Sequence, residues 1–376
     1  MSAPAYTPFS GSYAPEDVQF VLNRLPPQPV VTVAEKERLI QSGARHYSQM
    51  LSAEAAPSPA YQALFADACQ RNQVAMAEDC LTLAALIAAR KAGPITLISL
   101  MRGGTPVGVV LNRLLRDWLK RPVQHYSLSI LRDKGLDSAA LAYVLAQGAV
   151  PESIVFVDGW TGKGVIAREL ASSVNAFNAQ RGTAIDAGLY ALVDLAGVSL
   201  GAASTADYLL PSSILNATVS GLVSRSLLSP EAPPGAAPET LHGCVYYEHL
   251  AAADVSRWFV DLISRQALAL ASGGKSPAQY AARAADTGHL AARSQAYLQA
   301  CQVAHGISDI NLIKPGIGEA TRVLLRRAPR LIILRASSAC EVAHLRLLAE
   351  DKHVPVVEDP SLPYQAVSLI KSSPDG

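Results

Sequence analysis

Short apolar runs alternate with longer segments of helical periodicity between residues 95 and 198. The runs that indicate buried strands are ITLISLM (95–101), VQHYSLSI (123–130), SIVFVDG (153–159) and GLYALVDLAG (188–197). Strands that alternate with helices are joined by crossover connections, which place the strands parallel to one another. The predicted fold class is therefore α/β, with a mostly parallel sheet that helices cover on both faces.

The length and the changes of pattern along the chain predict two domains. A single hydrophobic core rarely organises as many as 376 residues. We expect a proline-rich, irregular N-terminal arm (1–60) with one short helix near 33–47, a main domain (61–270), a helical connector (271–304) and a smaller α/β domain (305–376). The segment SPEAPPGAAPET (229–240) holds four prolines in twelve residues and is predicted to be a loop.

The composition argues against several classes of protein. The formal net charge is +1, so a contact with nucleic acid would have to come from a local basic patch. The five cysteines are scattered and form no CxxC pair, which argues against a disulfide framework or a structural zinc site. We see neither a signal peptide nor an apolar run of about 20 residues, and we expect a cytoplasmic protein without a membrane span.

A glycine-rich turn follows the apolar run in IVFVDGWTGKG (154–164), where a predicted strand ends and a helix begins. Glycines at such a turn expose backbone N–H groups beside the positive end of a helix, which favours an anion. The spacing fits neither a Walker A loop nor a dinucleotide-binding fingerprint. The turn therefore predicts a phosphate site of another kind, with a turn that holds no ligand as the alternative.

Two further segments follow predicted strands in the same way. SLMRGGTPVG (99–108) places Arg102, Gly103 and Gly104 between a strand and a helix, and LRDKGLD (131–137) is a polar, glycine-containing turn. Ligands of open α/β sheets bind at the carboxyl ends of the strands, where all three segments would lie. The alternatives are an Arg102 that pairs with a surface carboxylate and a plain solvated turn at 131–137.

The three segments in this order resemble the motifs of type I phosphoribosyltransferases. In that family an apolar strand, two acidic residues, two spacers and a Thr- and Gly-rich loop bind phosphoribosyl pyrophosphate (PRPP). Asp158 takes the second acidic place here, and Val157 stands at the first. The resemblance implies a phosphoribosyltransferase-like sheet domain in which Asp158, followed by Gly159, binds the ribose. It also implies Mg²⁺ as a cofactor, held indirectly at Asp158, to neutralise the departing pyrophosphate.

The same resemblance assigns the remaining residues of the expected PRPP site. The 5′-phosphate would be bound by Thr161, Gly162, Lys163, Gly164 and Val165, and the pyrophosphate by Arg102, Gly103 and Gly104. The segment 131–137 corresponds to a mobile loop that closes over the reacting centre, which makes Arg132 and Lys134 candidates there. Closure would keep water from the oxocarbenium-like ribosyl cation. Arg102, Asp158 and Lys134 are the expected catalytic residues.

Three segments are similar in sequence to one bacterial family in particular: VFVDGWTGKG, NATVSGLVSR (216–225) and HGCVYYEHL (242–250). Its members are phosphoribosyltransferase-like proteins of stress-response and tellurium-resistance operons, fused to a C-terminal PELOTA RNA-binding domain. The resemblance spans about residues 15 to 376 and implies an enzyme that uses PRPP and Mg²⁺ to make a nucleoside-like metabolite or to act in an RNA-linked stress response. The polar segment 216–225 suits a binding loop or a helix start.

The same family also carries the label StiP, a presumed cysteine protease, and this stays open as an alternative. A thiol nucleophile needs a histidine within hydrogen-bonding reach and a third group that orients it. Cys244 and His242 would share one face of a strand, although no known nucleophile signature surrounds them. A structural Cys244 is the other interpretation, and a nucleotide- or RNA-binding protein without turnover is a third.

The C-terminal segment KPGIGEATRVLLRRA (314–328) resembles the kink-turn RNA-binding fold to which PELOTA domains belong. Gly316, Glu319, Thr321 and Arg322 match that family's G-x-N-E-x-T-K motif, with Gly318 in place of the asparagine. Residues 311–352 hold eight Lys or Arg against four Asp or Glu. The resemblance implies structured RNA as a partner, and a domain that docks a protein or small ligand is the alternative. The sequence leaves monomer and homodimer open.

Overall fold

The computed structural model describes residues 6–32, 35, 38, 39, 42–52, 54–228 and 241–371. The predicted loop 229–240 lies outside these residues, as does much of the helix expected near 33–47. Within the described residues, no helix combines the length and the apolar character that crossing a membrane would require.

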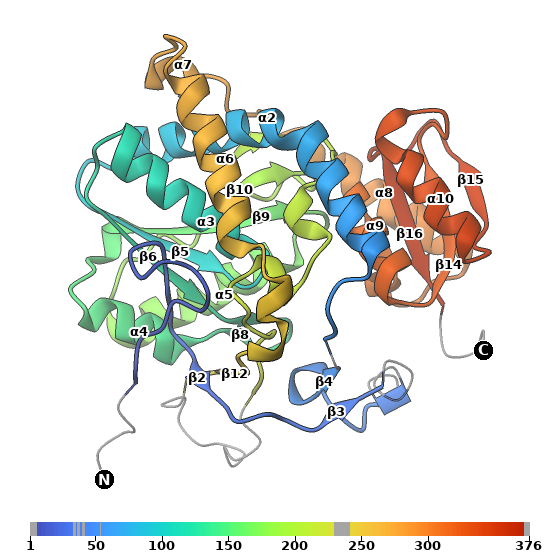
Figure 1. Cartoon of the computed structure of the whole chain (residues 1–376), viewed down its shortest axis with the longest axis horizontal. Helices are drawn as coiled ribbons and strands as arrows, with labels where there is room; N and C mark the ends of the chain where they lie inside the picture. The colour runs from blue at the N-terminus through green and yellow to red at the C-terminus, as the bar shows by residue number, and fades with distance from the viewer. Residues whose placement is uncertain are drawn as a thin grey trace.

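The main domain is built on a six-stranded sheet in the order β1-β6-β5-β9-β10-β11 (Figure 1). Every neighbouring pair in this sheet is parallel. The strands are β1 (Gln19–Phe20), β5 (Ile95–Leu100), β6 (Val123–Leu128), β9 (Ile154–Thr161), β10 (Leu189–Asp194) and β11 (Gly201–Ser204). The predicted α/β class with a mostly parallel sheet is therefore confirmed.

Helices cover both faces of this sheet because the central strands are apolar on both sides. Val155 and Val157 of β9 join one buried cluster, whereas Ile154 and Phe156 join another. Such strands are typical of parallel sheets. The first cluster contains residues of α2 (Pro59–Arg90), α3 (Gly104–Arg113) and α6 (Ser256–Ala271), and the second contains residues of α4 (Ser138–Ala146) and α5 (Val165–Arg181).

The N-terminal arm is less irregular than the sequence predicts. Besides the edge strand β1, it contains β2 (Asn23–Arg24), which pairs with β12 (Gly243–Cys244), and β3 (Val30–Val31), which pairs with β4 (Leu51–Ser52). Strands of two residues are too short to leave a periodic signal, so only their tertiary partners define them. A further hairpin joins β7 (Ile130–Leu131) to β8 (Gly135–Leu136).

The smaller C-terminal domain has a four-stranded mixed sheet in the order β13-β16-β14-β15. Its elements are β13 (Ile313–Pro315), α9 (Ile317–Arg326), β14 (Pro329–Leu334), α10 (Ala343–Asp351), β15 (Val356–Glu358) and β16 (Ala366–Ile370). The helices α7 (Pro277–Ala281) and α8 (Leu290–His305) connect it to the main domain. The second, smaller α/β unit predicted near the C-terminus is present.

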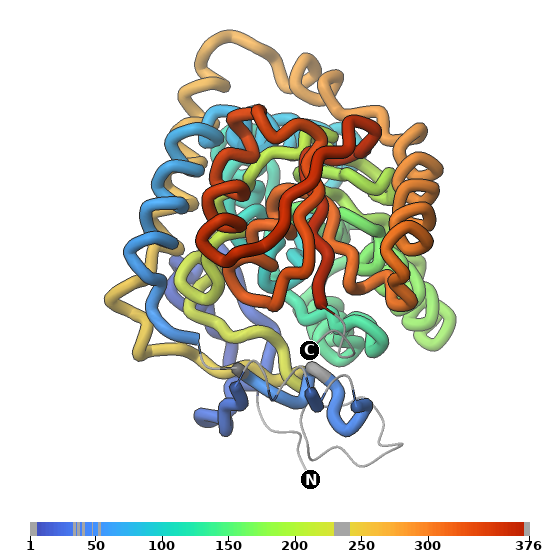
Figure 2. The backbone as a smooth tube through the Cα atoms, turned by 90° about the vertical axis from the view of Figure 1, so that its right-hand side faces the viewer, coloured from blue at the N-terminus to red at the C-terminus, as the bar shows by residue number. Residues whose placement is uncertain are grey.

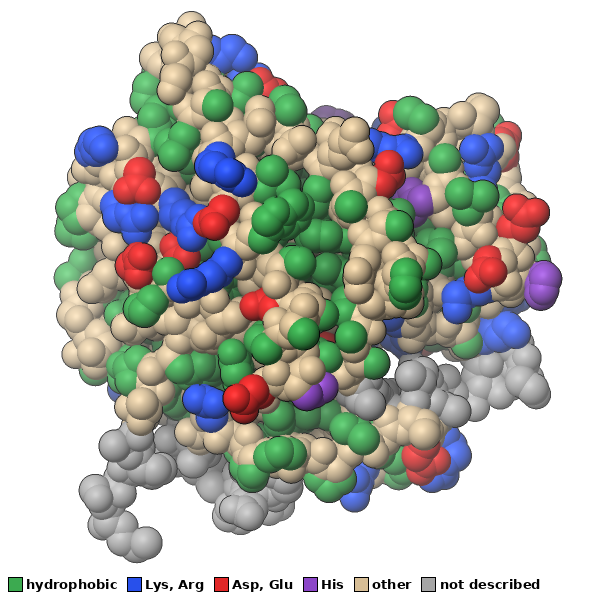
Figure 3. Space-filling model, in the orientation of Figure 1, with side chains coloured by type: hydrophobic (Ala, Val, Ile, Leu, Met, Phe, Trp, Pro, Cys, Tyr) green, Lys and Arg blue, Asp and Glu red, His purple; other side chains and the backbone are tan. Residues whose placement is uncertain are grey.

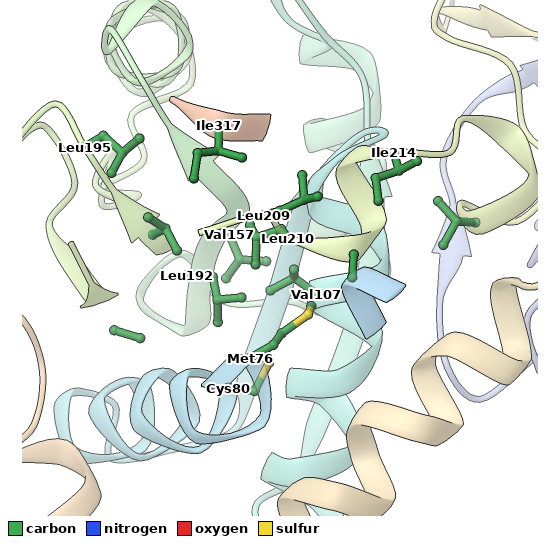
Figure 4. Close-up of a cluster of buried hydrophobic side chains, with 14 of the residues drawn as sticks. Met76, Cys80, Val107, Val157, Leu192, Leu195, Leu209, Leu210, Ile214 and Ile317 are labelled. Carbon is green, nitrogen blue, oxygen red and sulfur yellow. The ribbon is translucent and has the colours of Figure 1, made fainter. Parts of the chain in front are cut away.

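The C-terminal domain packs against the main domain, in front of its strands in the view of Figure 2. Ile317 of α9 belongs to one buried apolar cluster with Leu195, Leu209 and Ile214 of the main domain (Figure 4). The carboxylate of Asp207 in the main domain accepts hydrogen bonds from two backbone N–H groups of the C-terminal domain, at 2.9 and 2.8 Å. A shared core and partly buried hydrogen bonds therefore hold the two domains together.

Candidate functional site

The candidate site lies where the order of the strands reverses. From β5 the chain continues to β6 on one side, and from there it crosses to β9 on the other side of β5. Ligands of open α/β sheets bind outside the carboxyl ends of the strands at such a point. The loop that holds Arg102 follows β5, and Asp158 lies near the end of β9. The structure thus places these two predicted residues on either side of the reversal.

The loop after β5 packs directly on Asp158 because it contains glycine. A Cβ atom on Gly104 would lie 2.8 Å from the carbonyl oxygen of Val157 and 3.2 Å from Oδ1 of Asp158. A Cβ atom on Gly103 would lie 3.5 Å from the same Oδ1 atom. Only glycine allows this close approach at position 104, so the predicted pyrophosphate loop and the predicted ribose-binding residue are in contact.

A cavity of about 340 Å³, here called the inner chamber, opens between these loops and helix α9. Its charged and aromatic lining comes from both domains and consists of Arg102, Asp158, Trp160, Arg225, Glu319 and Arg322. The guanidinium of Arg322 lies over the ring of Trp160, 5.6 Å from its centroid. The C-terminal domain therefore forms one wall of a site whose base is the sheet of the main domain.

The carboxyl group of Asp158 titrates near neutrality in this chamber. Burial raises its pKa from 3.8 to about 7, against the opposing effects of the Gly159 N–H group and of Arg322. The Gly159 N–H group donates to Oδ1 of Asp158 at 2.7 Å. Burial raises the pKa of Glu319, but Arg322 and other nearby cations lower it by more, so the pKa of this carboxyl lies below its ordinary value. Two carboxyl groups of one chamber thus differ in proton affinity.

A larger cavity of about 1090 Å³, here called the outer cavity, adjoins the inner chamber. Both are lined by Arg102, Leu215, Asn216, Arg225, Glu319 and Arg322. Eight Arg or Lys side chains and four Asp or Glu side chains line the outer cavity. One of these cations, Arg326, is partly buried, and this burial together with Arg322 and Arg102 lowers its pKa to about 9. Such an excess of cations suits an anionic ligand.

The cation excess is a property of this cavity and not of the outer face over α3 and α6. Figure 3 shows acidic and basic side chains interspersed on that face. In this region Arg113 of α3 pairs with Asp17 and with Asp261 of α6, each at 2.6 Å. Paired charges of this kind leave no single-sign field.

Arg102 is held by groups of the protein in this structure. Its guanidinium lies 2.7 Å from Oε1 of Glu54 and 3.3 Å from both Oδ1 of Asn216 and the carbonyl oxygen of Val223. The side chains of Arg102 and Glu54 are 15% and 14% exposed. The carboxylate that the sequence alternative foresaw as Arg102's partner is therefore present, but it is largely buried and belongs to the N-terminal arm.

The predicted 5′-phosphate loop packs against the C-terminal domain. Thr161 ends β9, and the amino group of Lys163 donates to the carbonyl oxygens of Ile310 and Ile313 at 2.8 and 2.9 Å. A Cβ atom on Gly162 would lie 3.1 Å from the carbonyl oxygen of Pro315. Burial lowers the pKa of Lys163 to about 7. Residues 161–165 line neither of the two cavities, and phosphate binding by them stays a prediction.

The segment expected to be a mobile loop forms the hairpin of β7 and β8. Arg132 and Asp133 at its tip line the outer cavity. Lys134 is exposed and lines neither cavity. The hairpin thus borders the site. Lys134 lines neither cavity, and its catalytic role stays a prediction.

The predicted RNA-binding motif is turned toward the main domain. Glu319 and Arg322 line the inner chamber, and Gly318 packs near Trp160. Thr321 is fully buried, where its hydroxyl donates to the carbonyl oxygen of Ile317 and lies 2.9 Å from a ring nitrogen of His344. Gly316 has a positive φ of 95° and lies against Leu195. RNA contact through this face stays a prediction, and it would require the two domains to move apart.

The predicted thiol site has no activated cysteine. Cys244 is fully buried, and burial raises the pKa of its thiol to about 12. The Nδ1 atom of His242 lies 2.7 Å from the hydroxyl of Ser129, and no hydrogen bond joins His242 to Cys244 among the described residues. Cys69, Cys80 and Cys301 are also buried, whereas Cys340 is exposed. His242 precedes β12 and Cys244 ends it, so the two residues do not share a strand face as predicted, and they form no thiol–imidazole pair in the described residues.

Several residues of the site carry no signal in the sequence. Glu54 lies in the arm, and Trp160 is a spacer in the motif that the resemblance used. Arg326 belongs to the basic segment that was assigned to RNA. Asn216 and Arg225, in contrast, come from the polar segment 216–225 that suited a binding loop, and both line the two cavities.

Comparison with known proteins places the chain in a family. A model of the family described as tellurite-like stress resistance cysteine protease StiP matches residues 11–264. The cysteine protease StiP of Acinetobacter baylyi is 41% identical over 372 residues, which cover 96% of this chain and 94% of that protein. The chain belongs to the StiP family. A PELOTA RNA-binding domain model matches residues 292–372, which confirms the resemblance seen in the C-terminal segment.

The names of the StiP family and of this relative are those of an enzyme. They agree with the expectation of an enzyme and favour the protease alternative over phosphoribosyl transfer. A hypoxanthine phosphoribosyltransferase mutant from Trypanosoma cruzi in complex with IMP is 14% identical, covers 53% of this chain and 92% of its own, and has a TM-score of 0.26. A mutant structure titled as an analysis of an invariant aspartic acid in HPRTs is 13% identical, covers 38% and 83%, and has a TM-score of 0.26. TM-scores this low do not support any inference about this chain.

Proposed function

We propose that this member of the StiP family is an enzyme that binds the phosphate-bearing sugar PRPP at the strand reversal. The enzyme would transfer the phosphoribosyl group of PRPP to an acceptor. The observation that carries the proposal is the contact between the Arg102 loop and Asp158 inside a chamber rich in cations. Arginine is suited to phosphate because its planar guanidinium presents two parallel donors. The names of the relatives do not indicate phosphoribosyl transfer, so this proposal depends on the geometry of the site.

In the proposed reaction, the bond between C1 of the ribose and the pyrophosphate oxygen breaks and its electron pair leaves with the pyrophosphate. A nitrogen of the acceptor forms the new bond to C1 and then loses its proton to solvent. Arg102 would stabilise the negative charge of the leaving group. The ionised Asp158 would accept hydrogen bonds from the ribose hydroxyls, and the two-domain chamber would keep water from the ribosyl cation.

Mg²⁺ fits this site only together with a ligand. The described residues contain no group of three or more His, Cys, Asp or Glu side chains arranged for a metal. Asp158 and Glu319 nevertheless line the same chamber, and Mg²⁺ is commonly held by one or two carboxylates together with substrate phosphates. Bound in this way, the ion would neutralise part of the pyrophosphate charge.

Calorimetric titration with PRPP and Mg²⁺ tests the proposal. We expect the wild type to bind, and Asp158→Asn to bind at least about tenfold more weakly because a neutral amide no longer attracts the ribose hydroxyls as a carboxylate does. Asp351→Asn, at the exposed end of α10, is the matched control and should bind like the wild type. Absence of binding to the wild type would overturn the proposal.

The second candidate is proteolysis, which the name of the StiP family favours. Cys244 could act only if its thiol became accessible, because it is fully buried. Cys340 is exposed, and His344 follows four residues later, but one ring nitrogen of His344 lies beside Thr321 and the ring also bonds the backbone of Glu341. Neither cysteine therefore has a free imidazole beside it.

Hydrolysis of denatured casein by single variants separates the two candidates. A protease that uses Cys244 would lose its activity in Cys244→Ala and keep it in Cys340→Ala. Equal activity of both variants and the wild type, or no hydrolysis at all, would dismiss a thiol mechanism at Cys244.

We also propose that the C-terminal domain binds structured RNA, on the strength of the match to the PELOTA model. The basic residues of the domain predict an affinity that falls with salt. Arg322→Glu should weaken binding to a kink-turn RNA, whereas Arg346→Glu, on the other helix of the same domain, should weaken it less. Equal effects of the two variants would contradict a role for the motif.

A further inference from the structure

A carboxylate of the protein itself occupies an oxyanion site at the junction of the two cavities. Oε1 of Glu54 lies 2.7 Å from the guanidinium of Arg102, and Oε2 accepts a hydrogen bond from the backbone N–H of Ala217 at 3.2 Å. The two donors come from separate parts of the main domain, the loop after β5 and the helical turn Ala217–Val219. A guanidinium and a backbone N–H that converge on two oxygens form a typical site for a carboxylate or a phosphate.

The surroundings of this site are built for more negative charge than Glu54 supplies. Asn216 accepts hydrogen bonds from both Arg102 and Arg326 through Oδ1, at 3.3 and 2.5 Å, and so holds the two guanidinium groups near each other. Arg322 lies close enough to lower the pKa of Arg326 further. Arg322 itself pairs with Glu319 at 3.4 Å. Two arginines, Arg102 and Arg326, therefore converge beside a carboxylate of charge −1, and a phosphate or pyrophosphate would balance them better.

We propose that Glu54 is an internal stand-in for a phosphate group of the ligand, and that the subsite formed by Arg102 and the Ala217 N–H binds a phosphate when the Glu54 carboxylate leaves. This inference rests on the proposed function, since the phosphate would belong to the pyrophosphate group of PRPP. The subsite includes a donor, the Ala217 N–H, from the polar segment 216–225 that suited a binding loop. It also makes Glu54 a competitor of the substrate.

Glu54 can leave the subsite without unfolding the arm. Its backbone carbonyl oxygen lies 3.1 Å from Nε2 of His249, a contact that does not involve the carboxylate. Glu54 itself lines the outer cavity, and its neighbours Ala55 and Ala56 are exposed. Rotation of the side chain into the outer cavity would therefore free both donors of the subsite and leave the main chain in place.

The test is calorimetric titration of inorganic pyrophosphate into the wild type, Glu54→Gln and Asp133→Asn. Removal of the competing carboxylate should lower the apparent Kd by about tenfold in Glu54→Gln, because the subsite no longer has to be vacated before binding. Asp133→Asn removes the same charge from the lining of the outer cavity without touching Arg102, and so measures the general effect of charge. Glu54→Ala should show the same direction as Glu54→Gln, and Arg102→Ala should abolish the gain.

A gain in Glu54→Gln no larger than that in Asp133→Asn, or weaker binding in either Glu54 variant, would overturn the inference and leave Glu54 as a structural partner of Arg102. The proposed function is judged separately by PRPP and Asp158→Asn. PRPP binding that depends on Asp158, together with pyrophosphate binding that ignores Glu54, would remove this inference alone. Tighter pyrophosphate binding in Glu54→Gln without any binding of PRPP would remove the proposed function alone.

Discussion

Replacement of Asp158 by asparagine should stabilise the protein at pH 8 while it weakens PRPP binding at least about tenfold. Burial raises the pKa of this carboxyl from 3.8 to about 7 in the folded protein. The unfolded chain therefore releases the proton near pH 4, whereas the folded protein keeps it until about pH 7. The favourable contribution of the protonated form is complete below pH 3.8, falls as the pH rises, and is lost above about pH 7.

The size of the effect follows from the same two values. The interval between 3.8 and about 7 sets an upper limit of about 4 kcal/mol on the free energy of unfolding lost at pH 8. Asp158 borders the inner chamber and is only partly buried, so solvent screening reduces the expected value to about 1–2 kcal/mol. Asparagine has the same shape, keeps an oxygen acceptor for the Gly159 N–H group and carries no charge, so it should recover this amount.

Urea unfolding of the wild type and the variant at pH 4 and pH 8 measures the difference. The free energy of unfolding of Asp158→Asn should exceed that of the wild type by about 1–2 kcal/mol at pH 8, and the two proteins should be nearly equal at pH 4. Asp351→Asn, with an exposed carboxyl group, should show no such dependence on pH. A variant that is equally or less stable than the wild type at pH 8 would refute the reasoning.

Three other substitutions probe how the site is assembled. Gly104→Ala should destabilise the fold by about 1–3 kcal/mol and abolish PRPP binding. Gly93→Ala, where a Cβ would meet nothing within 4 Å, should do neither. Equal urea midpoints and equal PRPP affinities for the two variants would contradict the close approach of Gly104 to Asp158. Asp207→Ala leaves two partly buried N–H groups of the C-terminal domain without this acceptor and should raise the rate of proteolysis between the domains. An unchanged rate would show that the shared core suffices. Tyr61→Phe removes a 2.6 Å hydrogen bond from Tyr61 to the carbonyl oxygen of Leu325, with an expected loss of about 1 kcal/mol by urea unfolding.

Local patterns in the sequence were sufficient to predict the parallel sheet, although not the short strands of the N-terminal arm. The alternation of apolar runs and helical periods predicts the parallel sheet, because the period of side-chain burial depends on residues that are near one another in the chain. The order of the motifs also places Arg102 and Asp158 at the carboxyl ends of β5 and β9, where the glycines after Arg102 pack against Asp158. A position at a strand end can be predicted because it depends only on where the strand stops.

What those side chains contact was decided by the tertiary structure alone. Lys163 was expected to bind phosphate, yet its amino group reaches backbone carbonyl groups about 150 residues further along the chain. Arg322, which the resemblance assigned to RNA, lies over Trp160, and Glu54, in an arm without periodicity, holds Arg102. Each of these contacts joins segments far apart in the sequence. No local spacing specifies such a contact, because it forms only when the two domains and the arm pack together and exclude water from between them.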